Sequence, residues 1–247
     1  MREDLIYGIH AVQHLLQTKP EHCLELYVLD TRADQRLLEI LAEAKIHGIR
    51  VQSLQKKALD QWLPDANHQG IAAKIRAQPL LSENDLSDLI ETAGKNALLL
   101  VLDGVQDPHN LGACLRTADA TGVTAVIIPK DRSASVTPVV RKVASGAAET
   151  IPVVQVTNLV RALEELKKLG VWILGTSFNT SESLYQADLK GPVAIVLGAE
   201  GTGLRRLTEE HCDILMQIPM CGVVESLNVS VAAGVCLYEA LRQRSSL

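Results

Sequence analysis

Apolar residues along this chain form two blocks, and in each block short apolar runs alternate with stretches of helical periodicity. Short apolar runs predict strands, and apolar residues three and four positions apart predict helices. Residues 1–77 carry these signals for the helices 7–17, 34–47 and a short one ending near Trp62, and for the strands 24–30, 49–54 and 70–77. We therefore expect residues 1–77 to form a small α/β domain.

The second block, residues 96–247, opens with the apolar run 97–104, which is typical of a strand buried on both faces of a parallel sheet. Regular alternation of strands and helices predicts an α/β fold with a parallel sheet covered by helices on both faces. The acidic stretch between the blocks, residues 78–95, is expected to be a linker, although its leucines would also suit a short amphipathic helix. Further signals indicate strands at 125–129, 153–156, 171–176, 193–197 and 214–218, and a helix at 158–169.

Composition narrows the class of protein without indicating a function. No apolar run reaches the ~18 residues of a membrane span, and the first ten residues lack the apolar core of a signal peptide, so we expect a cytoplasmic protein. The five cysteines include no Cys-x-x-Cys pair, so neither a disulfide framework nor a zinc site is expected. The net charge of −5 does not indicate a nucleic-acid-binding protein, so any RNA site must be a local cationic patch.

Polar residues that could bind a ligand or take part in catalysis follow three of the predicted strands. The first segment, LDGVQDPHNLGACLRTADATG (102–122), joins a buried strand to a helix that begins near Pro108 and Asn110. Arg116 lies off the apolar stripe of this helix, about 9 Å along its axis from Asn110. Helical side chains tilt toward the N-terminus, so the guanidinium could reach back to a ligand near Asn110. A helix cap and a solvated arginine would explain the same residues.

The second segment, VAIVLGAEGTGLRRL (193–207), runs from a strand into Gly198, Gly201 and Gly203, which allow a ligand or another strand to approach the backbone. The spacing G-x-x-G-x-G differs from the dinucleotide fingerprint. Glu200 would repel a pyrophosphate, whereas a carboxylate suits the sulfonium, ammonium and ribose hydroxyls of S-adenosylmethionine. A tight strand–helix turn without a ligand is the alternative.

The third segment, ILMQIPMCGVVESLNVSVAAGVCLYEALRQR (214–244), contains a strand, a loop and a long helix. Ser226 is the expected N-cap of this helix, with Asn228 in its first turn. The helix is apolar nearly all round from Val229 to Leu241, which predicts burial on more than one side, either at a subunit interface or beneath another part of the chain. Under the alternative, Ser226 and Asn228 only cap the helix.

Together and in this order, the three segments resemble the motifs of the SpoU/TrmH family of RNA 2′-O-ribose methyltransferases, within the SPOUT class. YGIHAVQHLL (7–16) and HQGIAAKI (68–75) extend the resemblance over essentially the whole chain, and it is closest to the bacterial members that modify a guanosine in the peptidyl-transferase loop of 23S ribosomal RNA. It implies a methyltransferase domain with a C-terminal trefoil knot, an N-terminal domain similar to ribosomal protein L30e that binds the RNA, and a homodimer. Knots are so rare that no periodicity would predict one.

The resemblance also implies roles for particular residues, with S-adenosylmethionine as the cofactor and no metal. Arg116 would be either the base that accepts the ribose proton or a cation that holds a phosphate and stabilises the developing oxyanion. A base role requires a guanidinium, which stays protonated in water far above neutral pH, to lose a proton. The implied catalytic set is Asn110, Arg116, Glu200, Ser226 and Asn228, and the implied adenosine pocket is lined by Thr176, Gly198, Ile218 and Leu227.

Two other functions stay open on the sequence. A transfer-RNA ribose methyltransferase of the same family would share the three motifs, although a separate N-terminal platform favours ribosomal RNA. A non-catalytic RNA-binding protein of ribosome assembly could keep the fold, although all five implied catalytic positions carry the expected residue types. The target nucleotide, and the choice between naked RNA and an assembly intermediate as substrate, do not follow from residue patterns.

Overall fold

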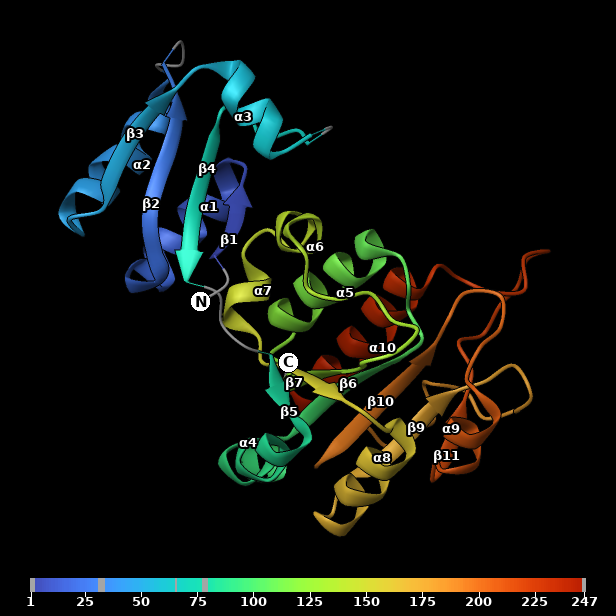
Figure 1. Ribbon diagram of the computed structural model, residues 1–247. Helices are drawn as coiled ribbons and strands as arrows, with labels where there is room; N and C mark the ends of the chain where they lie inside the picture. The colour runs from blue at the N-terminus through green and yellow to red at the C-terminus, as the bar shows by residue number, and fades with distance from the viewer. Residues whose placement is uncertain (1–2, 31–33, 65, 77–79, 246–247) are drawn as a thin grey trace. The chain divides into compact units, whose positions relative to one another are not determined.

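The computed structural model describes residues 3–30, 34–64, 66–76 and 80–245 (Figure 1). Its internal contacts divide the chain into two compact units. The first unit combines residues 1–79 with 136–150, and the second combines 80–135 with 151–247. The domain boundary expected after residue 77 lies outside the described residues.

The first unit is built on a four-stranded sheet of order β1-β4-β2-β3, in which only β2 and β3 are parallel. Successive side chains of a strand point to opposite faces, so Ile6 packs with the long helices while Tyr7 packs with Leu59 of the short helix. Its elements are β1 (Glu3–Tyr7), α1 (Ile9–Thr18), β2 (Cys23–Leu29), α2 (Gln35–Ile46), β3 (Arg50–Leu54), α3 (Lys56–Trp62) and β4 (Ile71–Arg76).

The helix expected from Tyr7 begins two residues later, because the preceding segment forms β1. Gly8 separates the two elements with a φ of 94°, a conformation that favours glycine. β1 is a short edge strand that pairs antiparallel with β4, whose residues lie 65 to 73 positions away, so local periodicity does not indicate it.

Residues 136–150, which sequence periodicity groups with the second block, pack instead with the first unit. They form α6 (Pro138–Val143) and α7 (Ala147–Thr150). The Lys142 ammonium lies 5.1 Å from the centre of the Tyr7 ring, and a Cβ on Gly146 would come 2.2 Å from the His14 side chain. The Arg141–Glu149 ion pair is buried in the same segment. These contacts are non-local, which is why the sequence pattern does not reveal them.

The second unit is a seven-stranded sheet of order β11-β9-β10-β6-β7-β8-β5, and every neighbouring pair is parallel. The apolar faces of α4 and α8 cover one side, whereas α5 and α10 lie side by side over the other (Figure 1). Its strands are β5 (Leu81–Ser82), β6 (Leu98–Asp103), β7 (Ala125–Pro129), β8 (Val153–Val156), β9 (Trp172–Thr176), β10 (Val193–Gly198) and β11 (Ile214–Met216). Its helices are α4 (Leu86–Ala93), α5 (Pro108–Ala120), α8 (Leu159–Lys168), α9 (Arg206–Glu210) and α10 (Val229–Arg244).

The acidic stretch expected to be a linker contributes two elements to this unit. β5 pairs with β8 at the edge of the sheet, and α4 buries Leu86 and Ile90 in the core. Asp88 and Glu91 are exposed on the same helix. Residues 86–93 of the stretch therefore form an amphipathic helix, because their leucine and isoleucine spacing places one apolar face on the sheet.

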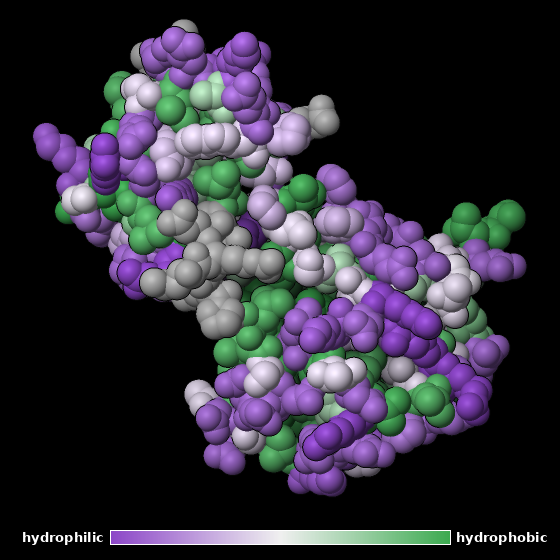
Figure 2. Space-filling view, viewed as in Figure 1, coloured by the Kyte–Doolittle hydropathy of each residue, from purple (hydrophilic) through white to green (hydrophobic). Residues whose placement is uncertain are grey.

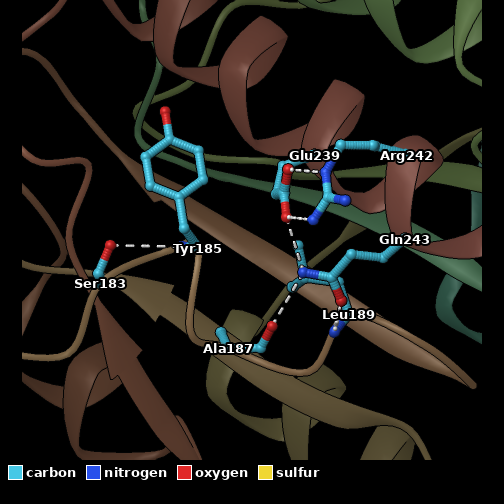
Figure 3. A network of polar contacts seen from close by, with 7 residues as sticks. All are labelled: Ser183, Tyr185, Ala187, Leu189, Glu239, Arg242 and Gln243. Atoms are coloured by element: carbon cyan, nitrogen blue, oxygen red, sulfur yellow. Dashed lines mark hydrogen bonds and ion pairs between the residues drawn. The ribbon is translucent and has the colours of Figure 1, made fainter.

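A network of polar contacts ties the end of α10 to the segment 187–189 (Figure 3). The buried Glu239 carboxylate accepts two hydrogen bonds of 2.8 Å from the Arg242 guanidinium and one of 2.9 Å from Gln243. Gln243 also donates to Ala187 O at 3.1 Å and accepts from the Leu189 N–H at 3.0 Å. The hydrogen bonds from Arg242 lower the pKa of Glu239 to about 2.

This network predicts a specific loss of stability in acid. A carboxyl group with a depressed folded pKa stabilises the fold above its unfolded pKa of about 4.3. That contribution is lost as the pH falls toward about 2. We expect Glu239→Gln to lower the free energy of unfolding by about 1 kcal/mol at neutral pH, since Arg242 is largely exposed. Urea unfolding should show this difference constant between about pH 5 and 7 and narrowing below about pH 4.5.

Glu165→Gln is the matched control, because Glu165 pairs with Lys168 at the same spacing but on an exposed part of α8. A Glu239→Gln protein that loses no more stability than the Glu165→Gln protein would contradict the structural role of the network.

Candidate functional site

The Glu200 carboxylate joins the three segments that the sequence motifs single out. Its Oε1 atom accepts hydrogen bonds from Asn110 Nδ2 at 3.0 Å, from Asn228 Nδ2, and from the Val229 N–H at 3.2 Å. Asn228 Nδ2 also donates to Asn110 Oδ1 at 2.9 Å. An amide NH₂ group has two protons, so Asn228 can serve both acceptors at once. The start of α5, the loop after β10 and the start of α10 therefore meet at one negative charge.

The glycine loop after β10 puts Glu200 in this position. Gly203 N donates to Ala199 O at 2.9 Å, which closes the loop, and Gly201 and Gly203 have φ values of 75° and 67°. A Cβ on Gly198 would lie 2.0 Å from the carbonyl carbon of Gly203. Glycine is therefore required at position 198 by close backbone approach, as the sequence pattern suggested, and the loop is a compact turn with Glu200 exposed at its tip.

The two asparagines of the site lie at helix starts. Asn110 is in the first turn of α5, whose N-cap Asp107 accepts from the His109 N–H at 2.9 Å. Asn228 is the N-cap of α10 and accepts from the Ser230 N–H at 2.9 Å. The expectation that Ser226 caps this helix is wrong, because Asn228 provides the side-chain acceptor and Ser226 lies exposed in the preceding loop.

A cavity lies beside this cluster, with about 640 Å³ of space that includes open solvent. Apolar side chains and a few polar groups line it, which is the usual lining of a small-molecule site. The sequence prediction missed further side chains at the cavity wall, which have no motif spacing of their own and include Phe178, Gln217, Met220, Glu225 and Ala232. The positions implied for cofactor binding all line it, together with two of the implied catalytic set: Thr176, Gly198, Ile218, Leu227, Glu200 and Ser226.

Arg116 stands apart from the Glu200 cluster. It is exposed on α5, beside the buried stripe of Leu111, Cys114, Leu115 and Ala118. Arg116 does not line the cavity, and its side chain has no hydrogen bond or ion pair within the described part of the chain. Its guanidinium is therefore available to a ligand outside the cavity.

Sequence reasoning missed Asp103, which binds Arg205 at the end of the glycine loop. Its carboxylate is fully buried at the end of β6, accepts from the Arg205 N–H at 2.9 Å and pairs with Arg205 Nε at 3.1 Å. Gly198 is also in register with Asp103 across β10 and β6, so both ends of the loop are held at the same residue. An aspartate that ends an otherwise apolar strand is the signal that could have indicated this role.

Two searches of the described residues gave no candidate. No group of three or more His, Cys, Asp and Glu side chains there could hold a metal ion. No helix among them is long and apolar enough to span a membrane.

Comparisons with known proteins identify the family of this chain. The model of the SpoU rRNA Methylase family matches residues 97–238, and the model named RNA 2′-O ribose methyltransferase substrate binding matches residues 5–81. The 23S rRNA (guanosine-2′-O-)-methyltransferase RlmB of Vibrio cholerae is 56% identical over 244 residues, which cover 99% of this chain and 98% of that protein.

Solved structures share the fold over nearly the whole chain. A crystal structure of an RNA 2′-O ribose methyltransferase has a TM-score of 0.79 and 28% identity, and covers 98% of this chain and 89% of that one. The SpoU methyltransferase AviRb from Streptomyces viridochromogenes, in complex with AdoMet, has a TM-score of 0.78 and 22% identity over 98% of this chain and 90% of that one. The chain therefore belongs to the SpoU rRNA Methylase family.

Proposed function

We propose that this chain transfers a methyl group from S-adenosylmethionine to the ribose 2′-hydroxyl of a guanosine in the peptidyl-transferase loop of 23S ribosomal RNA. The observation that carries the proposal is the 56% identity, over nearly the whole of both chains, to a protein named as a 23S rRNA (guanosine-2′-O-)-methyltransferase. The match of residues 5–81 to a substrate-binding family favours an RNA platform in the N-terminal part, as expected of an L30e-like domain.

The residues that line the cavity beside Glu200 suit S-adenosylmethionine in polarity and charge. Gly198, Ile218 and Leu227 offer backbone groups and apolar surface for the adenosine, and Thr176 lies at its wall. The carboxylates of Glu200 and Glu225 line the same space and suit a cationic ligand. When bound, S-adenosylmethionine supplies an activated methyl group on its sulfonium, so the protein has chiefly to align the two reactants.

The chain's own residues would do that alignment. We assign Asn110, Glu200 and Asn228 to a rigid polar frame, because their mutual hydrogen bonds fix each side chain. Ser226, exposed at the cavity wall, would contact the ribose. Arg116 would act on the RNA as a cation, which holds a phosphate and stabilises the oxyanion as the 2′-hydroxyl releases its proton to solvent. The absence of a protein partner for its side chain in the described residues supports this role over a base role.

The same proposal includes a homodimer, a C-terminal knot and a cytoplasmic protein. Val231 and Tyr238 of α10 are 51% and 54% exposed, and a partner chain would cover them. Ala233 is fully buried within the chain, so it is unsuited to testing an interface. β11 lies at one edge of the sheet, and the chain then runs back past β9 to Glu200 in the loop after β10. This return supports a knotted path. Sedimentation equilibrium measures the number of chains directly.

Methyl transfer to defined RNA tests the function. We expect label from tritiated S-adenosylmethionine to enter a transcript of the peptidyl-transferase-loop region, and nucleotide mapping to find one 2′-O-methylguanosine. Glu200→Gln, which keeps the side-chain shape but removes the charge that three donors share, should lower the rate about a hundredfold. Label that enters transfer RNA instead would favour the other substrate, and no label in any RNA would contradict the enzyme assignment.

A further inference from the structure

Cationic side chains with no protein partner follow β7 in the second unit. The loop 130–133 carries Lys130 and Arg132, both exposed. Neither side chain forms a hydrogen bond or an ion pair within the described ranges. β7 is parallel to β6, so this loop and the segment that leads to Asn110 both leave the sheet at the carboxyl ends of its strands. We call this end of the sheet its carboxyl edge.

The loop is held in a defined shape against that segment. Ala134 N donates to Val105 O at 2.8 Å, and Ser133 Oγ donates to the same oxygen at 3.2 Å. Arg132 has a φ of 56°, in the left-handed region that side chains other than glycine rarely adopt. Surrounding contacts must impose such a conformation, and residues held in this way cluster at ligand-binding and active sites.

Arg205 brings a third cation to the same edge. A Cβ on Gly104 would lie 3.2 Å from Arg205 Nη2 and 3.8 Å from the carbonyl oxygen of Arg132, so the two loops approach one point. The Arg205 side chain is 44% exposed although it pairs with buried Asp103. Figure 2 shows strongly hydrophilic side chains gathered over these loops and α9.

We propose that the loop 130–133 and Arg205 form a phosphate-binding edge that holds the RNA backbone next to the methylated nucleotide. The inference rests on the proposed function and adds to it a contact surface outside the Glu200 cluster. Exposed Lys and Arg side chains without protein partners are the groups that bind nucleic-acid phosphates. Asp131 is the acid on the loop, and Asp103 is already neutralised by Arg205, so the edge keeps a net positive charge.

The test compares two double variants with equal loss of charge. Lys130→Gln/Arg132→Gln removes the two unpartnered cations of the edge. Lys95→Gln/Lys190→Gln is the control, because Lys95 and Lys190 are exposed and lie just before β6 and β10, at the opposite edge of the parallel sheet. Each protein is titrated with a transcript of the peptidyl-transferase-loop region between about 50 and 200 mM salt.

We expect the edge variant to bind this RNA roughly tenfold more weakly at about 0.1 M salt, and the slope of log Kd against log salt to fall by about 1.5. The KM for RNA should rise while kcat at saturating RNA and the Kd for S-adenosylmethionine stay near wild type. An unrelated structured transcript should lose affinity similarly, since phosphate contacts carry no sequence information.

The behaviour of the wild-type protein distinguishes failure of the proposed function from failure of the phosphate-binding edge. If the wild-type protein neither binds nor methylates the transcript, the proposed function is wrong. If the wild type methylates it and the edge variant keeps the wild-type Kd and salt slope, or loses no more than the control, the phosphate-binding edge is wrong. Equal thermal unfolding midpoints of the proteins exclude misfolding as the cause.

Discussion

Replacing Arg116 with alanine is expected to lower methyl transfer at least about a hundredfold, while the affinity for S-adenosylmethionine stays close to wild type. Arg116 is exposed and does not line the cavity, so its truncation should alter neither the core nor the cofactor pocket. Titration calorimetry with the cofactor and single-turnover methylation of the RNA transcript measure the two quantities separately. Arg161→Ala, another exposed arginine on a helix of the same unit, serves as the control.

Arg116→Lys separates the two roles that the sequence leaves open. Lysine keeps the charge but lacks the planar guanidinium with its paired donors. If Arg116 is a phosphate and oxyanion clamp, the lysine variant should retain measurable activity, and the alanine variant should also bind RNA more weakly. Near-normal turnover by the alanine variant would leave α5 with an ordinary solvated arginine and would refute its place in the site.

Alanine at Gly198 should strongly weaken cofactor binding, because it displaces the backbone of the loop. The added methyl group would lie 2.0 Å from the Gly203 carbonyl carbon and 2.3 Å from Leu204 N. These are backbone atoms, so no flexible side chain can move aside and the whole turn that carries Glu200 must shift. We expect the affinity for S-adenosylmethionine to fall about a hundredfold or more, and the free energy of unfolding to fall by about 1–3 kcal/mol.

Gly222→Ala is the matched control, because nothing lies within 4 Å of a Cβ at that position. Gly222 lies in the exposed loop before α10, and its φ is not positive, so alanine there causes no backbone strain. Calorimetry and urea unfolding of both variants check the prediction. A Gly198→Ala protein that binds the cofactor as well as the Gly222→Ala protein would show that the loop does not form the cofactor pocket.

Apart from β5, the strands of the second unit were predicted within two residues, because they are largely apolar runs bounded by polar or turn residues. β6 is buried along its whole length, so nearly every residue in it contributes to the signal. β1 and β5 were not predicted. β5 has only two residues and forms because β8 offers it a partner, which no local pattern reports.

The candidate site was predicted from motifs, and the geometry adds what joins them. Gly198 was singled out for close backbone approach, and the Gly203 backbone is the group that approaches it. Asp103 was missed because a single buried acid has no periodicity, and Ser226 was preferred as the N-cap because both serine and asparagine suit that position. The roles of these residues in catalysis are the predictions that the variants above test.

By itself the sequence determined the α/β class, the parallel strands of the second sheet and the three segments that carry polar residues, because all of these depend on neighbours in the chain. Only the tertiary structure decided that residues 136–150 pack with the first unit and that one carboxylate joins the three segments. Asn110 is 90 positions from Glu200 and 118 from Asn228. Contacts over such separations are set by the order of the strands in the sheet, which local periodicity does not encode.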